Sequence, residues 1–187
     1  MNYILLFIAV GIVVGGAVIF NRLVHLRNRS QGAWADIDVQ LKRRHDLVGN
    51  LVETVKGYAS HEKNTLEDVV RARTRAENAR DSAEPREAGK AEDQLSGQVK
   101  NLFALAEAYP DLKASDRFLD LQRALVELEN DLQNARRYYN AVVRDLNTRI
   151  QSVPDLLVAR PLGFKERDFF ELDSIAEAEA PVVKLEG

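Results

Sequence analysis

The side chains best suited to catalysis or metal binding in this sequence are three histidines, His25, His45 and His61. The chain also has 29 Asp and Glu residues that could act with them. A carboxylate-bridged metal site in a helical bundle needs Glu-x-x-His on two of its helices. No histidine here has a glutamate three residues before it, because those positions hold Arg22, Lys42 and Tyr58. We therefore expect neither a metal site nor a cofactor.

Other catalytic patterns are missing as well. His45 and His61 lie sixteen residues apart, which corresponds to ~24 Å along one straight helix, too far for both to bind one ion. His61 precedes Glu62, but Thr65 and Leu66 stand where a zinc-binding HExxH motif would need its second histidine. The sequence also lacks a nucleophile elbow, a phosphate-binding loop and a dinucleotide fingerprint. These observations predict that the protein is not an enzyme.

A basic run, Lys42–His45, is the next candidate for an interaction site. Four consecutive helical residues cover about one turn and cannot form a single flat basic face. The run could bind anionic lipid headgroups or an acidic partner surface. We favour the alternative that Lys42, Arg43 and His45 are solvated while Arg44 pairs with a carboxylate from another helix, such as Asp131 or Glu127.

A second cluster combines arginine with tyrosine and comprises Arg136, Arg137, Tyr138 and Tyr139. Arginine beside tyrosine could serve recognition of a partner. Packed tyrosines with arginines that extend along them to solvent are the commoner arrangement, and we favour it. Trp34, Arg44, His45 and this cluster are the candidate structural or interaction residues.

The segment Ala33–Tyr58 positions the first of these groups. Its apolar residues recur at steps of three, four or seven, which is typical of a long amphipathic helix and not of a strand. They are Trp34, Ile37, Leu41, Val48, Leu51 and Val55. In a heptad register with Trp34 at position a, Arg44 is the only charged residue on this seam. Leu47 and Val52 widen the apolar face beyond what one neighbouring helix would cover.

The remaining pattern predicts an all-α fold. Ser30 is a candidate N-cap for a helix over 31–59, and Asn64 with Glu67 has the spacing of a capping box for a second helix to about 82. These two helices could equally be one helix kinked near His61. Further helices are expected over 85–108 and from Ser115 to Pro154. The predicted architecture is an elongated antiparallel bundle of three to four long helices over 30–153. Residues 154–187 form an irregular C-terminal segment, partly packed through Phe164, Phe169 and Phe170, with an acidic mobile end.

The N-terminal segment, 1–29, is expected to be a transmembrane anchor with a basic collar. Tyr3–Phe20 is eighteen residues without a charge, which as a helix reaches roughly 27 Å. A cleaved signal peptide is the alternative, but no Lys or Arg precedes the apolar run. Arg22, Arg27 and Arg29 follow it, and positive residues favour the cytoplasmic side. We expect a single pass with the N-terminus outside and the bundle in the cytoplasm. Gly11 and Gly15 form a GxxxG pair that permits close helix contact.

The net charge and its distribution limit the classes of partner that the protein could bind. The net charge is −3, whereas a nucleic-acid-binding domain carries a basic footprint. Residues 21–56 hold seven Lys or Arg against four Asp or Glu, while residues 165–187 hold three against seven. The chain has no cysteine, so neither a disulfide nor a thiolate metal site is possible. We expect a lipid bilayer as partner and no nucleic acid.

Four blocks of the sequence resemble the LemA family. They are AWADIDVQLKRRHDLVGNLVETVKGYASHE, LFALAEAYPDLKASDRFLDLQ, ARRYYNAVVRDLN and PDLLVARPLGF. The match extends over nearly the whole chain, in order and with the single N-terminal span. The resemblance implies a helical-bundle protein of bacterial membranes, here the cytoplasmic (inner) membrane, with no agreed catalytic residues. Gly49 stands where the family pattern has proline, and only proline would remove a backbone donor there.

These observations lead to two expectations for function. The first is a non-enzymatic, membrane-anchored helical scaffold or adaptor that self-assembles into a homo-oligomer. The second is a regulator or accessory subunit of an integral-membrane enzyme such as a protease, which would make a membrane protein its partner. The wide apolar face at Leu47 and Val52, the glycine pair and the confinement of chains to a membrane favour self-assembly.

Overall fold

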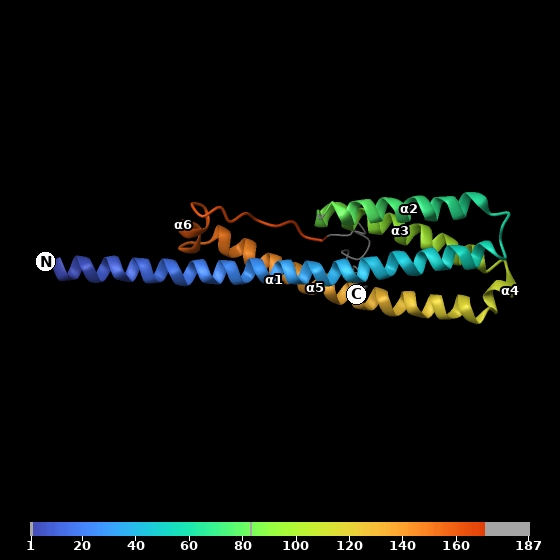
Figure 1. Ribbon diagram of the computed structural model, residues 1–187, viewed down its shortest axis with the longest axis horizontal. Coiled ribbons are helices and arrows are strands. Elements are labelled where there is room, and N and C mark those ends of the chain that lie inside the picture. Colours follow the sequence, from blue (N-terminus) through green and yellow to red (C-terminus); the bar gives the residue numbers. More distant parts are fainter. Residues whose placement is uncertain (1, 83, 171–187) are drawn as a thin grey trace, which may run out of the picture. The chain divides into compact units, whose positions relative to one another are not determined.

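The computed structural model describes residues 2–82 and 84–170. Over these residues the chain is all-α, without a strand, and begins with one long apolar helix, which confirms the predicted fold class (Figure 1). The helices are α1 (Asn2–Lys56), α2 (Lys63–Asp81), α3 (Pro85–Ala106), α4 (Pro110–Lys113), α5 (Asp116–Gln151) and α6 (Asp155–Ala159). The chain divides into two compact units. Unit 1 contains residues up to Leu41 together with Leu128–Phe169, and unit 2 is built from Lys42–Glu127.

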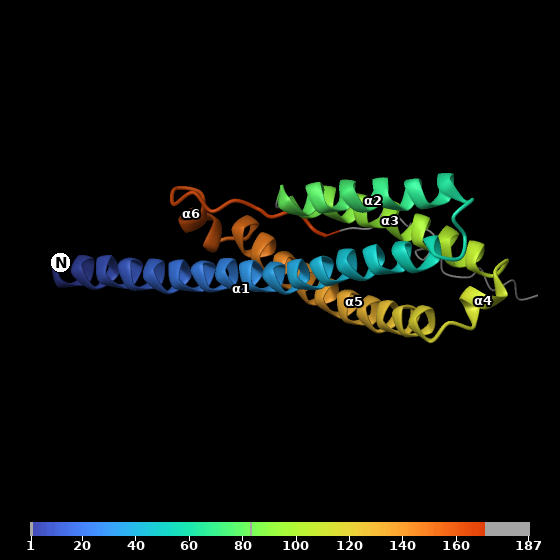
Figure 2. The same cartoon turned by 45° about the vertical axis from the view of Figure 1, so that its right-hand side comes forward.

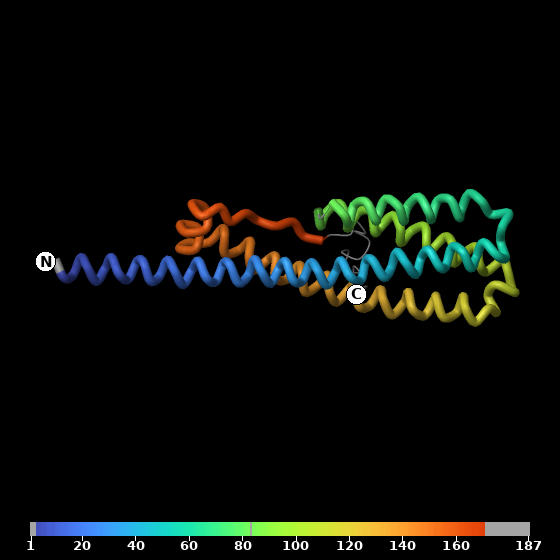
Figure 3. Tube along the Cα trace, in the orientation of Figure 1, coloured from blue at the N-terminus to red at the C-terminus, as the bar shows by residue number. Residues whose placement is uncertain are grey.

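Helix α1 continues without a break for 55 residues, as the tube in Figure 3 shows. The prediction that Ser30 caps a new helix is therefore wrong. No glycine or proline lies between Asn21 and Gln31, so nothing in the collar interrupts the helix. Ser30 is buried inside α1, and its hydroxyl donates to the carbonyl of Arg27 at 2.8 Å. This bond satisfies the hydroxyl within the helix.

The chain turns between α1 and α2, which resolves the alternative of one kinked helix in favour of two helices. The first turn begins at Gly57, where Tyr58 and Ala59 both donate backbone bonds to the carbonyl of Val55. Helix α2 begins at Lys63, and no side chain caps its N-terminus. The capping role predicted for Asn64 is therefore wrong, because Asn64 already lies inside the helix.

The later helices follow the predicted pattern closely. Helix α3 begins at Pro85 as expected and ends at Ala106, two residues before the predicted end. Helix α5 has 36 residues and ends shortly before Pro154, as its apolar period predicts. Helix α6 was not predicted, because five residues are too few to display a helical period.

The core of unit 2 joins residues from α1, α2, α3, α4 and α5. Helices α2 and α3 lie side by side in both Figure 1 and Figure 2. The core's fully buried side chains include Val48, Leu51, Leu95, Leu102 and Leu112. Val52 belongs to this core and Leu47 packs against it. The wide apolar face of α1 is therefore covered by the chain's own helices and is not a free surface for assembly.

Unit 1 has a smaller core where α1 emerges from its apolar segment. It consists of Leu23, Leu26, Leu146, Ile150 and Ala159, with Phe164 packed against it. The Phe164 ring meets Phe20 edge-on with 5.9 Å between centroids, and the Arg27 guanidinium lies over the same ring. The predicted return of this phenylalanine to the bundle is confirmed. The predicted acidic mobile end, from Ser174 onwards, lies outside the described residues.

Candidate functional site: a buried charge network and an aromatic clamp

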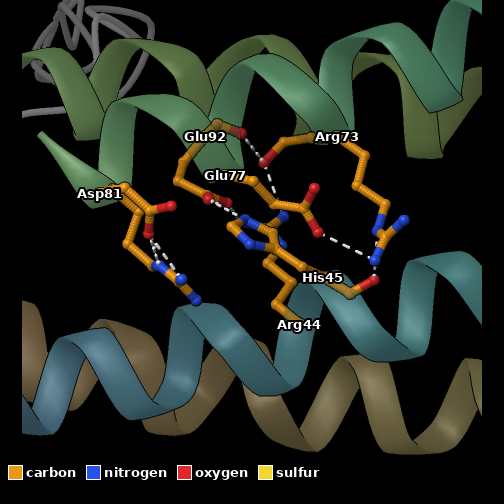
Figure 4. A network of polar contacts seen from close by, with 8 residues as sticks. Arg44, His45, Arg73, Glu77, Asp81 and Glu92 are labelled. Atoms are coloured by element: carbon orange, nitrogen blue, oxygen red, sulfur yellow. Dashed lines mark hydrogen bonds and ion pairs between the residues drawn. The ribbon is translucent and has the colours of Figure 1, made fainter.

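The candidate site in unit 2 is a charge network centred on Glu92 of α3 (Figure 4). The carboxylate accepts a bond from Arg44 Nη1 at 3.1 Å on one oxygen. Its other oxygen lies 2.6 Å from His45 Nε2. Arg44 Nη2 also donates to the hydroxyl of Ser96 at 2.7 Å, one turn further along α3. Two adjacent residues of α1 are thereby joined to one turn of α3.

The network is closed to solvent. Arg44 retains 8% of its exposed area, and His45 and Glu92 retain 1% each. The expectation that Arg44 pairs with a carboxylate from another helix is met, but the suggested partners were wrong. The expectation that His45 is solvated is also wrong, because His45 faces the same carboxylate inside the core. Glu127 and Asp131 are exposed on α5, whereas Glu92 is buried on α3. Glu92 stands in step with Leu95, Val99 and Leu102 on the apolar face of α3, and this periodicity could have identified it.

Helix α2 joins the network through Arg73. Its Nε donates to the backbone carbonyl of His45 at 2.7 Å, and its Nη2 lies 2.9 Å from a carboxylate oxygen of Glu77. The guanidinium lies against Gly49, since a Cβ placed there would meet Arg73 Cζ at 3.5 Å. Arg73 thus holds α2 to the stretch of α1 that also carries Arg44 and His45.

The chemistry of this arrangement favours alignment of helices over catalysis. Both oxygens of Glu92 are already engaged, and the group is shielded from water. A shift of α1 along α3 would separate the charges and leave a buried carboxylate unpaired, at a high cost in free energy. The described residues contain no group of three or more His, Asp or Glu arranged to hold a metal ion. The network therefore specifies the register of α1, α2 and α3.

The candidate site in unit 1 is an aromatic clamp on α5. The Tyr139 ring is fully buried and lies 5.6 Å from the Trp34 ring of α1, centroid to centroid. Its hydroxyl donates to the carbonyl of Asp168 at 2.9 Å. Two turns later, the Asn147 side chain exchanges two hydrogen bonds with the backbone of Arg167, at 2.8 and 2.9 Å. Tyr139 and Asn147 together fasten the irregular segment after α6 to α5.

The neighbours of Tyr139 divide between two environments. Tyr138 is 48% exposed, and Arg29 of α1 both donates to its hydroxyl at 3.2 Å and lies over its ring. Arg137 is exposed and donates to Asn134 within the helix at 2.6 Å. Arg136 is half-buried. The sequence analysis did not identify Asn147, because a single amide side chain gives no periodic signal. Asn147 is nevertheless the last residue of ARRYYNAVVRDLN, one of the segments that resemble the LemA family.

Burial gives Tyr139 a distinctive titration. Desolvation is the main cause that raises the pKa of this phenol to about 12 from 10.0, and the nearby Arg167 charge opposes the shift. Between these two pH values the unfolded chain loses the proton that the folded chain keeps, so stability falls as pH rises. Below pH ~10 this contribution is fully present. The bond to the Glu62 carboxylate also raises the pKa of Tyr109. We expect the last tyrosine to ionise in an absorbance titration at 295 nm to be Tyr139, and we expect Tyr139→Phe to remove that last step while leaving the step of Tyr109. Persistence of the last step in Tyr139→Phe would contradict the assignment.

Comparison with known proteins identifies the family. The family model described as LemA family matches residues 33–185, which is most of the chain. The chain belongs to the LemA family. Protein LemA of Metamycoplasma hominis is 26% identical over 166 residues, covering 88% of this chain and 74% of that protein. Magnetosome protein MamQ 2 of Paramagnetospirillum magneticum is 24% identical over 178 residues, and MamQ of Magnetospirillum gryphiswaldense 23% over 180.

The extent of these matches places both candidate sites inside the family region. Each MamQ match covers 81% of this LemA-family chain, but the chain spans only 64% of either MamQ protein. The region 33–185 begins one residue before Trp34 and includes the charge network and the aromatic clamp. The apolar segment Tyr3–Phe20 lies before it.

Proposed function

We propose that this protein is a membrane-anchored, non-enzymatic helical scaffold or adaptor that self-assembles. The observation that carries the proposal is the continuity of α1, in which an exposed apolar segment passes directly into a helix of the folded core. No glycine or proline separates the apolar segment, which ends at Phe20, from Leu23 and Leu26, the first core residues of α1. Such a helix suits a protein that presents a surface at a fixed height above a membrane.

The apolar segment needs an environment other than water. Its side chains are widely exposed, with Tyr3 at 79% and Phe7 at 77%. A contiguous apolar surface of this kind on a soluble monomer marks a membrane or a protein interface. By length and composition α1 is the helix of the described residues that could cross a bilayer, and the segment is consistent with membrane anchoring.

The relatives support a membrane-associated role. The chain matches the LemA family and is similar to proteins named magnetosome proteins, and none of these names describes a catalysed reaction. An engaged and buried charge network agrees with a structural role for the polar groups of the core. These points favour a scaffold over an enzyme.

Topology is the first test of the proposal. Arg22, Arg27 and Arg29 follow the apolar segment and are exposed, so the positive-inside rule places the bundle in the cytoplasm. Protease added to intact spheroplasts is expected to leave a C-terminal tag uncut and to remove it once the cells are lysed. Loss of the tag from intact spheroplasts would show the opposite orientation.

Self-assembly is the second test. Because the face at Leu47 and Val52 is covered, the remaining support for self-assembly comes from Gly11 and Gly15. A Cβ added at either glycine would have no heavy atom within 4 Å, so open space surrounds both positions. Two helices can approach closely along such a pair.

We expect the protein mass measured by light scattering in mild detergent to be that of an oligomer. In the double variant Gly11→Ile with Gly15→Ile, we expect the mass to fall to that of a monomer.

The matched control is Val10→Ile with Val14→Ile, which adds bulk at the same spacing on a neighbouring face. This variant is expected to remain oligomeric. A monomeric wild-type protein across a hundredfold concentration range would reject the self-assembling scaffold. It would favour the second candidate, a regulator of an integral-membrane enzyme.

A further inference from the structure

A pocket of about 650 Å³ lies in unit 1, between α1, α5 and the turn that leads into α6. The α1 wall carries Arg22, His25 and Arg29. Their spacings of three and four residues place them on one face of the helix. The opposite wall contributes Arg144, Thr148 and Arg149 of α5. Cationic side chains from two helices therefore face a common space.

Positive charge exceeds negative charge in this pocket. Four arginines and His25 line it, against the two carboxylates of Asp145 and Asp155. Asp155 is already neutralised by Arg149, whose Nη1 lies 2.9 Å from its carboxylate oxygen. Arg22 and Arg144 make no hydrogen bond or ion pair with any residue in 2–82 or 84–170. Two guanidinium groups are thus available for a phosphate, which they bind through paired N–H donors.

The position of the pocket along α1 indicates that the phosphate belongs to a lipid headgroup and not to a soluble molecule. Arg22 comes two residues after Phe20, the last residue of the apolar run. From Arg22 to Arg29 the helix rises ~10 Å, and the polar layer on each side of a bilayer is roughly 5–8 Å thick. The pocket therefore begins at the depth of the lipid phosphates. Leu26, which also lines the pocket, packs with Ile150 of α5 in the small core of unit 1 and so holds the two walls together.

We propose that this pocket binds the phosphate of an anionic phospholipid headgroup, with Arg22 and Arg144 as the principal contacts. The proposal rests on the proposed membrane anchor, because the anchor places the pocket at the headgroup layer. Basic pockets beside membrane helices are recognised sites for anionic headgroups. Bound lipid would join α1 to α5 at the point where the chain leaves the membrane.

The test measures lipid binding to full-length protein by native mass spectrometry from detergent. Phosphatidylglycerol and phosphatidylcholine with identical acyl chains are titrated separately. We expect phosphatidylglycerol to bind at least tenfold more tightly. Arg22→Gln and Arg144→Gln are each expected to weaken it about fivefold, the factor that corresponds to roughly 1 kcal/mol per arginine.

Arg27→Gln is the matched control. Arg27 lies at a similar depth but outside the pocket, over the Phe164 ring. It is expected to change binding by less than about twofold, whereas a diffuse surface attraction would weaken by the same factor for all three arginines. Thermal unfolding of each variant is measured first, and a variant whose melting temperature falls is replaced by the corresponding methionine variant, which lacks the charge and is expected to weaken binding by the same factor.

Three results would overturn the proposal. One is equal affinity for the two lipids, and another is a loss in Arg27→Gln as large as that in Arg22→Gln. The third is binding of inorganic phosphate as tight as that of phosphatidylglycerol, which would make the ligand a soluble anion. Extraction of the protein from membranes by alkaline carbonate tests the anchor separately. A protein that is extracted yet still selects phosphatidylglycerol in detergent would refute the anchor and retain the pocket.

Discussion

Arg44→Ala is expected to lower the free energy of unfolding by about 3–5 kcal/mol. The substitution removes the donor to Glu92 Oε2 and leaves a carboxylate that is only 1% exposed without its ion-pair partner. Desolvation of that charge was compensated by Arg44, and His45 alone faces the other oxygen. Chemical unfolding of the full-length protein in mild detergent, followed by helical circular dichroism, measures the effect.

Arg43→Ala is the control for this prediction. Arg43 is the adjacent residue of the same helix and is exposed, so its loss is expected to change the free energy of unfolding by no more than about 0.5 kcal/mol. Similar shifts for Arg43→Ala and Arg44→Ala would show that burial and pairing do not distinguish the two arginines.

A double-mutant cycle tests whether the two partners act together. Glu92→Ala is also expected to be strongly destabilising, because it removes the Glu92 carboxylate from the buried side chains of Arg44 and His45. The double variant removes both charges, so its cost should be smaller than the sum of the two single costs by about 0.5–3 kcal/mol. Additive costs would mean that the pair is not coupled.

The sequence allowed prediction of those features that repeat along a helix. The apolar period of α5 gave its length, and the heptad register placed Arg44 on the buried seam. The period of α3 marks Glu92 as a buried position. It does not show that Glu92 meets Arg44, because the two residues lie 48 positions apart and their pairing depends on how two helices meet. The continuity of α1 through Ser30 was missed because a good capping residue also fits inside a helix when its hydroxyl bonds backward.

Features without a period could not be read from the sequence. The clamp formed by Tyr139 and Asn147 holds two residues of an irregular segment, and its bonds end on backbone atoms that every residue possesses. The pocket beside Arg22 depends on the turn before α6, which closes one end of the space between two helices. Such sites require the three-dimensional arrangement of separate segments within unit 1.

Gly49→Pro is expected to cost less than about 2 kcal/mol, although proline inside a helix ordinarily costs ~3 kcal/mol or more. Proline at 49 removes the donor that the helix directs at the carbonyl four residues earlier, that of His45. In this protein Arg73 Nε already donates to the same carbonyl at 2.7 Å. The carbonyl would keep one bond, and replacing glycine also reduces the entropy of the unfolded chain.

A Cβ at this position would have room, so the steric cost of proline here is limited to the contact of its ring with the His45 carbonyl. The nearest atoms to a Cβ on Gly49 are those of the Arg73 guanidinium, at 3.5 Å and beyond, which is ordinary van der Waals contact. Asp46→Pro is the matched control, because Asp46 is exposed on the same helix. There the carbonyl of Lys42 would lose its helical donor, and no side chain in 2–82 or 84–170 donates to it as a replacement. We expect Asp46→Pro to show the full cost of proline in a helix.

The decisive measurement is the same proline with Arg73 removed. In the wild-type background Arg73→Ala is expected to cost about 0.5–1.5 kcal/mol, because the His45 carbonyl still accepts the backbone bond from Gly49. In the Gly49→Pro background the same change leaves that carbonyl with no donor, at a further cost of about 1–3 kcal/mol. The two substitutions should therefore be more damaging together than the sum of their separate effects. Arg73→Lys keeps a positive charge near Glu77 but lacks the Nε bond. If the loss of stability in Arg73→Ala comes from the lost charge, Arg73→Lys should restore stability; if it comes from the lost Nε bond, Arg73→Lys should not. Equal costs of Arg73→Ala in both backgrounds would show that Arg73 does not support the backbone of α1 at this point.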